Sequence, residues 1–169
     1  MPRPTRERGF TLLEVLVVIV IVGVLVTLAT LTLGDRRGQR LEEESARLAA
    51  LIGLAQEEAV FQSREMAVSF WRGGYAFHEL VGADWQLVSG DSTFQPRRLP
   101  DGMSLRLYLD DVEVGLSLVE KREPQVFLLS SGETSAFELV LEVEDGPART
   151  LTMDLVGNLH VEALDEPWR

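Results

Sequence analysis

The sequence predicts an α+β protein, in which one long amino-terminal helix precedes a mainly antiparallel β domain of two packed sheets. Two observations support this fold class. Residues 10–33 form an apolar run with a single charge, and near residue 66 the spacing of apolar side chains changes from about 3.6 to 2. A chain of 169 residues accommodates one modest domain and an appendage.

The first element is the apolar run of residues 10–33, whose only charged side chain is Glu14. As a helix it would rise about 36 Å, against a membrane hydrocarbon core of about 30 Å, which is enough for one crossing. It is longer than the apolar core of a secretory signal peptide, and no small-residue cleavage site follows it. A carboxylate inside a membrane helix is costly, so Glu14 is a candidate functional residue. The alternative is a glutamate tolerated near the membrane interface.

Residues 9–14 read Gly-Phe-Thr-Leu-Leu-Glu and follow a short leader that contains three arginines. This segment resembles the class III signal of type IV pilins and type II secretion pseudopilins. The resemblance implies a leader peptide of residues 1–9, cleavage by prepilin peptidase between Gly9 and Phe10, and N-methylation of the new Phe10 amine. It further implies that Glu14 meets the terminal amine of a neighbouring subunit in a filament.

A pairing of this kind would explain the carboxylate in the apolar helix. A buried ion pair adds little net stability, but removing one partner strands a charge and costs about 3–5 kcal/mol. The Glu14 pair would therefore act mainly as a device that sets the axial register between subunits.

Residues 34–63 are predicted to form an amphipathic helix. Two glycines within residues 34–38 predict a weak point at its start. Apolar side chains then recur at helical spacing and are expected to face the core: Leu41, Leu48, Ile52, Ala55 and Ala59. The acidic run of residues 42–44 is interpreted as part of the solvated face, with Glu43 and Arg47 as a favourable i,i+4 pair.

Residues 64–169 are predicted to form a periplasmic β domain. Alternating apolar residues indicate strands over 66–70, 75–77, 103–109, 112–118 and 159–161, and a hairpin that joins 137–144 to 151–155. The uninterrupted apolar run of residues 126–129 suits a strand covered on both faces. Close spacing of some eight strands favours antiparallel sheets.

Two further segments, Leu-Pro-Asp-Gly-Met-Ser-Leu at residues 99–105 and residues 124–142, are similar to the globular domain of the GspH/FimT family. This resemblance implies a minor pseudopilin of type II secretion, a structural subunit near the tip of a periplasmic pseudopilus that helps to export folded proteins. It implies a single-pass inner-membrane protein with a periplasmic carboxy-terminal domain. The implied partners are the major pseudopilin, the other minor pseudopilins and prepilin peptidase. Residues 80–98 match no family pattern.

The sequence offers no catalytic site, metal site or cofactor motif. The chain has no cysteine, and His78 and His160 each alternate with apolar neighbours, so both are expected to be solvated strand residues. Asp110, Asp111 and Glu113 lack the glycine and terminal glutamate of an EF-hand loop and are interpreted as a solvated turn.

The charge of the chain excludes one class of partner. Outside residues 1–33 it carries 13 basic and 25 acidic side chains, a net charge of −12, which disfavours binding to nucleic acid. Two alternative functions stay open at this point. One is a minor pilin that primes assembly of a type IV pilus, and the other is a membrane-anchored periplasmic enzyme.

Overall fold

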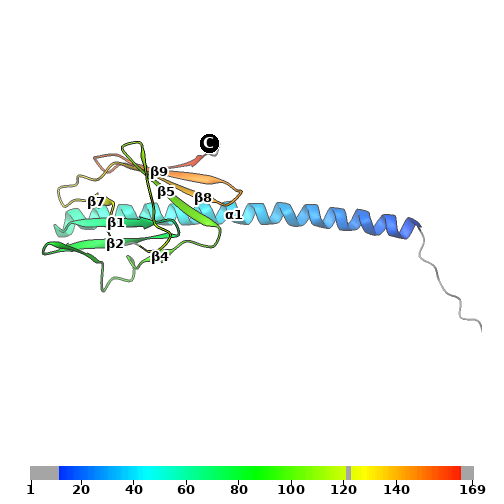
Figure 1. The fold of residues 1–169 in the computed structure, drawn as a ribbon, viewed down its shortest axis with the longest axis horizontal. Helices are drawn as coiled ribbons and strands as arrows, with labels where there is room; N and C mark the ends of the chain where they lie inside the picture. The colour runs from blue at the N-terminus through cyan, green and yellow to red at the C-terminus, as the bar shows by residue number, and fades with distance from the viewer. Residues whose placement is uncertain (1–11, 121–122, 165–169) are drawn as a thin grey trace, which may run out of the picture. The chain divides into compact units, whose positions relative to one another are not determined.

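The computed structural model describes residues 12–120 and 123–164, except for the side chains of residues 26–36. The chain forms two compact units, residues 1–36 and 37–169. One helix, α1 (Leu12–Gln62), is followed by two antiparallel sheets, which confirms the predicted α+β class (Figure 1).

Helix α1 is continuous for 51 residues and passes through Gly34 and Gly38 without a break. The predicted weak point is therefore not an interruption of the helix. Two glycines cost about 2 kcal/mol of helix propensity. Helix formation is cooperative, so the long helical segments on both sides of these glycines outweigh a local penalty of this size.

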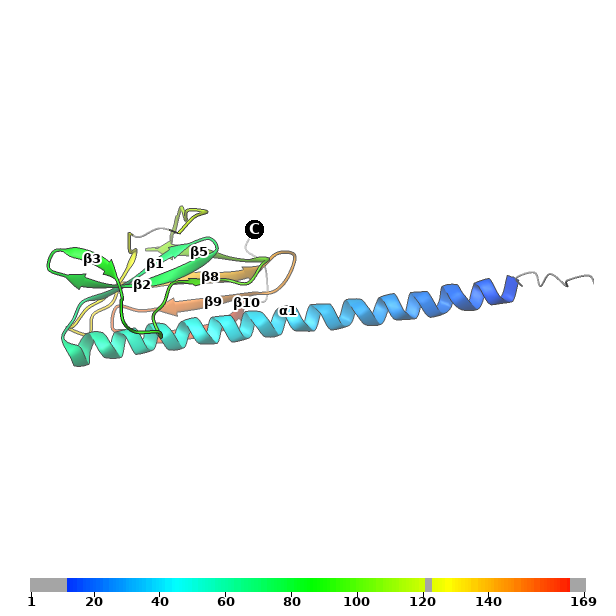
Figure 2. The ribbon, with the colours of Figure 1, turned by 90° about the horizontal axis from the view of Figure 1, so that it is seen from below.

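Within residues 37–169, α1 lies along one side of both sheets (Figure 2). Its five predicted core residues are all essentially inaccessible to solvent, which confirms the helical pattern: Leu41, Leu48, Ile52, Ala55 and Ala59. They pack with apolar side chains from both sheets into one core. The burial of this stripe is the main reason that the amphipathic half of α1 is stable.

The first sheet has the strand order β3-β2-β1-β7, with β4 paired to β2. Its strands are β1 (Met66–Trp71), β2 (Gly74–Val81), β3 (Asp84–Leu87), β4 (Arg97–Arg98) and β7 (Val126–Leu128). A turn at Gly73 and Gly74 joins β1 to β2, and the indole of Trp71 fills the space that a side chain at position 74 would need. Strands β3 and β4 were not predicted, because they are short and lack a clear alternation.

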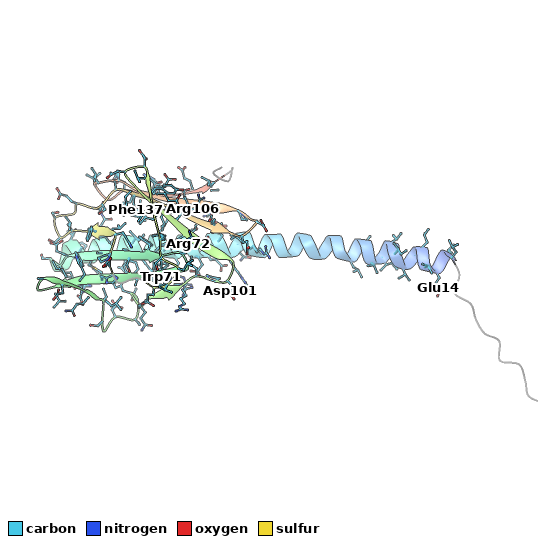
Figure 3. All side chains as sticks on the ribbon, in the orientation of Figure 1. Glu14, Trp71, Arg72, Asp101, Arg106 and Phe137 are labelled. Atoms are coloured by element: carbon cyan, nitrogen blue, oxygen red, sulfur yellow. The ribbon has the colours of Figure 1, made fainter. Side chains whose placement is uncertain are left out.

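The second sheet has the strand order β10-β9-β8-β5-β6. Its strands are β5 (Met103–Leu109), β6 (Val112–Val114), β8 (Phe137–Val143), β9 (Ala148–Met153) and β10 (Leu159–Leu164). The predicted hairpin is present, with Leu139 opposite Leu151. Arg72, at the end of β1, links the sheets, because its carbonyl accepts a 2.9 Å hydrogen bond from the Leu105 amide (Figure 3).

Several predictions about individual residues are wrong. Strand β6 ends at Val114, β9 ends at Met153, and the apolar residues Leu118 and Leu155 beyond those ends are exposed. His78 is buried rather than solvated, and the Ser69 hydroxyl lies 2.8 Å from its Nε2. Glu44 is also buried. Glu44 is paired with Arg97, 53 residues later in the sequence, and His78 contacts Ser69 on the neighbouring strand β1.

Candidate functional site

The predicted assembly site lies at the amino-terminal end of α1. Gly9 and Phe10 fall outside the described residues, so the predicted cleavage and methylation sites are not structurally characterised. Glu14 lies in the first turn of α1 and is exposed within this chain (Figure 3). A carboxylate is favourable at this end of a helix because the unpaired amides there carry partial positive charge.

The part of α1 directly after Glu14, residues 15–25, is apolar around its whole circumference. Between residues 12 and 25, twelve large apolar side chains are 44–86% exposed. A helix with no polar face is normally covered by other protein or by lipid. Among the residues described, no helix reaches the combined length and apolarity that a membrane crossing requires. The predicted crossing of residues 10–33 extends beyond the described part, since residues 10–11 and the side chains of 26–33 are not described.

The fold does not bring the two histidines together as a dyad. His78 lies on β2 of the first sheet, whereas His160 lies on β10 of the second sheet and is exposed, as predicted. In the described ranges, no group of three or more acidic or histidine side chains is arranged to hold a metal ion. Asp110 and Asp111 form the tight turn between β5 and β6, and both have left-handed backbone conformations.

A partly buried ion pair, which was not predicted from the sequence, holds the segment between β3 and β5 against α1. Arg97 donates from Nε and Nη2 to the two carboxylate oxygens of Glu44, at 3.0 and 2.6 Å. The Glu44 side chain is 9% exposed and the Arg97 side chain 34%. Phe94, three residues before Arg97, is buried against Phe77 at a ring-centroid distance of 5.1 Å. These contacts explain how residues 88–98 are ordered without a long strand.

Tyr75 lies next to this ion pair, on β2. It is fully buried, and among the described residues its hydroxyl has no hydrogen-bond partner. Burial raises the pKa of Tyr75 to about 12, and Glu44 also raises it, whereas Arg97 and Arg47 lower it. The phenol is therefore held in its neutral form across the physiological range.

Tyr75→Phe is expected to leave stability at pH 7 unchanged or raise it by about 1 kcal/mol, because it removes an unsatisfied buried hydroxyl. The raised pKa of Tyr75 favours the folded state up to about pH 10, and this contribution is lost as the pH rises from 10 to 12. Between pH 10 and 12, the free energy of unfolding of the variant should therefore fall by about 2–3 kcal/mol less than that of the parent. Urea unfolding at several pH values measures this difference.

Tyr108→Phe is the matched control, because Tyr108 is only partly buried and its hydroxyl accepts a 3.1 Å hydrogen bond from Arg106. If the Tyr75→Phe protein lost as much stability between pH 10 and 12 as the parent, the raised pKa of Tyr75 would be contradicted.

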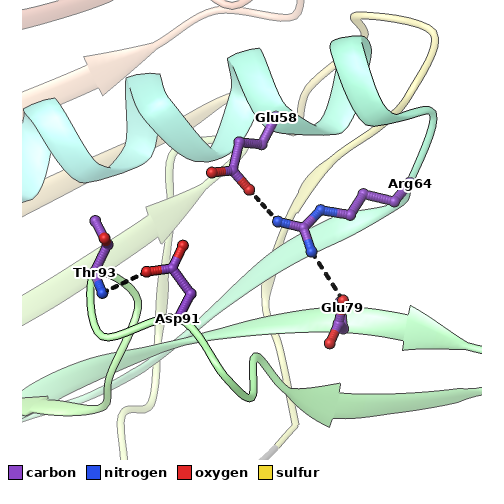
Figure 4. Close-up of polar contacts among 5 residues, drawn as sticks. All are labelled: Glu58, Arg64, Glu79, Asp91 and Thr93. Atoms are coloured by element: carbon purple, nitrogen blue, oxygen red, sulfur yellow. Dashed lines mark hydrogen bonds and ion pairs between the residues drawn. The ribbon is translucent and has the colours of Figure 1, made fainter.

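A second ionic cluster fastens the end of α1 to β2. Arg64 donates from Nη1 to Glu79 at 3.0 Å and from Nη2 to Glu58 (Figure 4). Nearby, Asp91 accepts a 2.7 Å hydrogen bond from the Thr93 amide, and its bonds with Thr93 lower the pKa of that exposed carboxyl. These contacts are structural and contain no nucleophile paired with a base.

Comparison with known proteins gives a match for the amino-terminal motif and a second match for the region that contains the β domain. Residues 4–30 match the prokaryotic N-terminal methylation motif, and residues 44–157 match the family described as type II transport protein GspH. The chain belongs to the GspH family. These matches confirm the resemblance seen in residues 9–14, 99–105 and 124–142 and identify a minor pseudopilin of type II secretion, in preference to a type IV pilus subunit.

Full-length relatives agree with this assignment. The chain is 33% identical to type II secretion system protein H of Aeromonas hydrophila, over 94% of this chain and 95% of that protein. It is 38% identical to the protein of the same name from Pseudomonas aeruginosa, over 89% and 92% respectively. GspH proteins are structural pseudopilin subunits, a class associated with other pseudopilins and with the inner membrane.

Solved structures share the GspH fold. The minor pseudopilin EpsH of Vibrio cholerae superposes with a TM-score of 0.66 at 22% identity, over 76% of this chain and 97% of that chain. GspH of E. coli gives a TM-score of 0.61 at 18% identity, over 77% and 92%. The similarity extends over nearly the whole of each solved chain but only about three quarters of this one.

Proposed function

We propose that this GspH-family subunit is cleaved by prepilin peptidase between Gly9 and Phe10 and N-methylated at Phe10. Residues 1–9 are the leader, 10–33 the membrane and assembly helix, 34–63 the amphipathic helix and 64–169 the periplasmic β domain. Before assembly the subunit resides in the inner membrane, and it is then incorporated into the tip region of the pseudopilus. There it associates with the major and the other minor pseudopilins and helps to export folded proteins.

The observation that carries this proposal is the single carboxylate of Glu14 within residues 12–25 of α1, where every other residue is apolar or glycine. After cleavage, Glu14 would be the fifth residue of the mature chain, close to the new Phe10 amine. A charge in apolar surroundings is stable only with a partner of opposite sign. The terminal amine of a neighbouring subunit supplies that partner during assembly.

Co-expression with prepilin peptidase is expected to produce a mature chain that begins with N-methylated Phe10. Intact-mass and amino-terminal peptide mass spectrometry measure both modifications. Co-expression with an inactive peptidase is the control, and the chain should then keep its leader of residues 1–9. Retention of the leader with active peptidase, or cleavage after Gly34, would refute the processing step.

A further inference from the structure

A cluster of apolar side chains lies at the carboxy-terminal end of α1, opposite the end at which α1 enters the unit of residues 37–169. Its members are exposed on the last turns of the helix and on the turn between β9 and β10: Leu54, Val60, Phe61, Leu155 and Val156. We call these five residues the distal surface. Phe61 is 85% exposed and Val156 is 74% exposed. Large apolar side chains exposed on neighbouring elements are candidates for a protein interface.

Hydrogen bonds hold the turn that presents Leu155 and Val156. The Asp154 carboxylate accepts hydrogen bonds of 2.9 Å from the amides of both Val156 and Asn158. Thr134 donates from its amide to the Leu155 carbonyl at 3.2 Å and from its hydroxyl to the Asp154 carbonyl at 2.6 Å. The turn is therefore rigid, so its apolar side chains are displayed before a partner binds.

The same turn lies against α1. The Gln56 side chain occupies the space beside Gly157, and Val60 lies against Gly132 in the neighbouring loop. The last turns of α1, the loop before β8 and the β9–β10 turn thus form one continuous surface.

The charge around the distal surface restricts what can bind there. Residues 54–65, 129–135 and 154–158 contain five acidic side chains and one basic side chain, Arg64. Arg64 is already paired with Glu58 and Glu79. A second copy of this chain would bring acidic rims together and be repelled, whereas a partner with lysine or arginine around an apolar protrusion would be attracted.

We propose that the distal surface docks a different pseudopilin subunit, which inserts an apolar protrusion flanked by lysine or arginine side chains. This inference rests on the proposed function, because it takes the partner from the same pseudopilus. It assigns the contact to the β domain and the end of α1, separate from the Glu14 contact.

The test uses the unit of residues 37–169. All its core residues lie at or after Leu41, and the EpsH chain that shares this fold matches only 76% of the present chain. The unit is titrated separately with the purified periplasmic domain of each other pseudopilin of the same secretion system. Phe61→Ser combined with Leu155→Ser should raise the Kd for one of these domains by at least about 10-fold.

The matched control is Val112→Ser combined with Leu118→Ser, which removes apolar side chains that are 67% and 77% exposed at β6 and the segment after it. This control should change the Kd by less than about 2-fold. Glu57→Lys combined with Glu133→Lys should slow association by about 10-fold at low salt and weaken its dependence on ionic strength. Circular dichroism checks that each variant is folded.

Three results would overturn the inference: binding of none of the domains to the parent unit, an equal loss in the control, or self-association of the unit through Phe61 and Leu155. Processing at Phe10 in the full-length chain is measured in parallel. Normal processing with unaltered binding by the distal variants contradicts this inference alone. Absent processing with intact, Phe61-dependent binding contradicts the proposed maturation alone.

Discussion

Glu14→Ala is expected to abolish recovery of this subunit in complexes with other pseudopilins, while membrane insertion and the folding of residues 37–169 stay unchanged. The substitution would leave the amine of a neighbouring subunit without its counter-charge in apolar surroundings, at a cost of about 3–5 kcal/mol, or at least 100-fold in affinity. Among the residues whose side chains are described, none before Leu41 belongs to the core of the β domain, so its thermal unfolding should not change. Crosslinking in membranes followed by co-purification measures the loss.

Two further substitutions separate charge from size. Glu14→Gln keeps the shape of the side chain without its charge and should fail as Glu14→Ala does. Glu43→Ala removes another exposed glutamate of α1, outside the apolar run, and should assemble normally. Unchanged co-purification of the Glu14→Gln protein would show that no ion pair forms there.

Arg97→Ala is expected to lower the free energy of unfolding by about 3 kcal/mol, more than Glu44→Ala does. The difference follows from the unequal burial of the pair, since the Glu44 side chain is 9% exposed and the Arg97 side chain 34%. Loss of Arg97 strands the Glu44 carboxylate where water hardly reaches it, whereas an unpaired Arg97 can turn toward solvent. Urea unfolding of the single variants and of the double variant measures the coupling.

Arg98→Ala provides the control for Arg97→Ala, because Arg98 is the next residue on β4 and is exposed. Its effect should stay within about 0.5 kcal/mol. Equal stabilities for the Arg97→Ala and Arg98→Ala proteins would show that the bond to Glu44 contributes no net stability.

Local patterns in the sequence were sufficient for the fold class. The core stripe of α1 follows from helical spacing, and seven of the strand positions follow from alternation, because both patterns record which residues share a face. The proposed processing residues Gly9 and Phe10 and the proposed assembly residue Glu14 follow from a contiguous motif, which needs no tertiary information. The continuity of α1 through Gly34 and Gly38 was not foreseen, since propensity describes single residues whereas helix formation is cooperative.

Only the tertiary structure decided what covers each face. Glu44 was expected on the solvated face of a helix and His78 on the solvated face of a strand, yet both are buried. The Arg97 partner of Glu44 lies 53 residues away. The distal surface likewise combines residues near 60 with residues near 155. Periodicity determines the direction of a side chain relative to its neighbours in the chain. Burial and partners depend on which distant segment packs against it, and that is set by the global arrangement of α1 and the sheets.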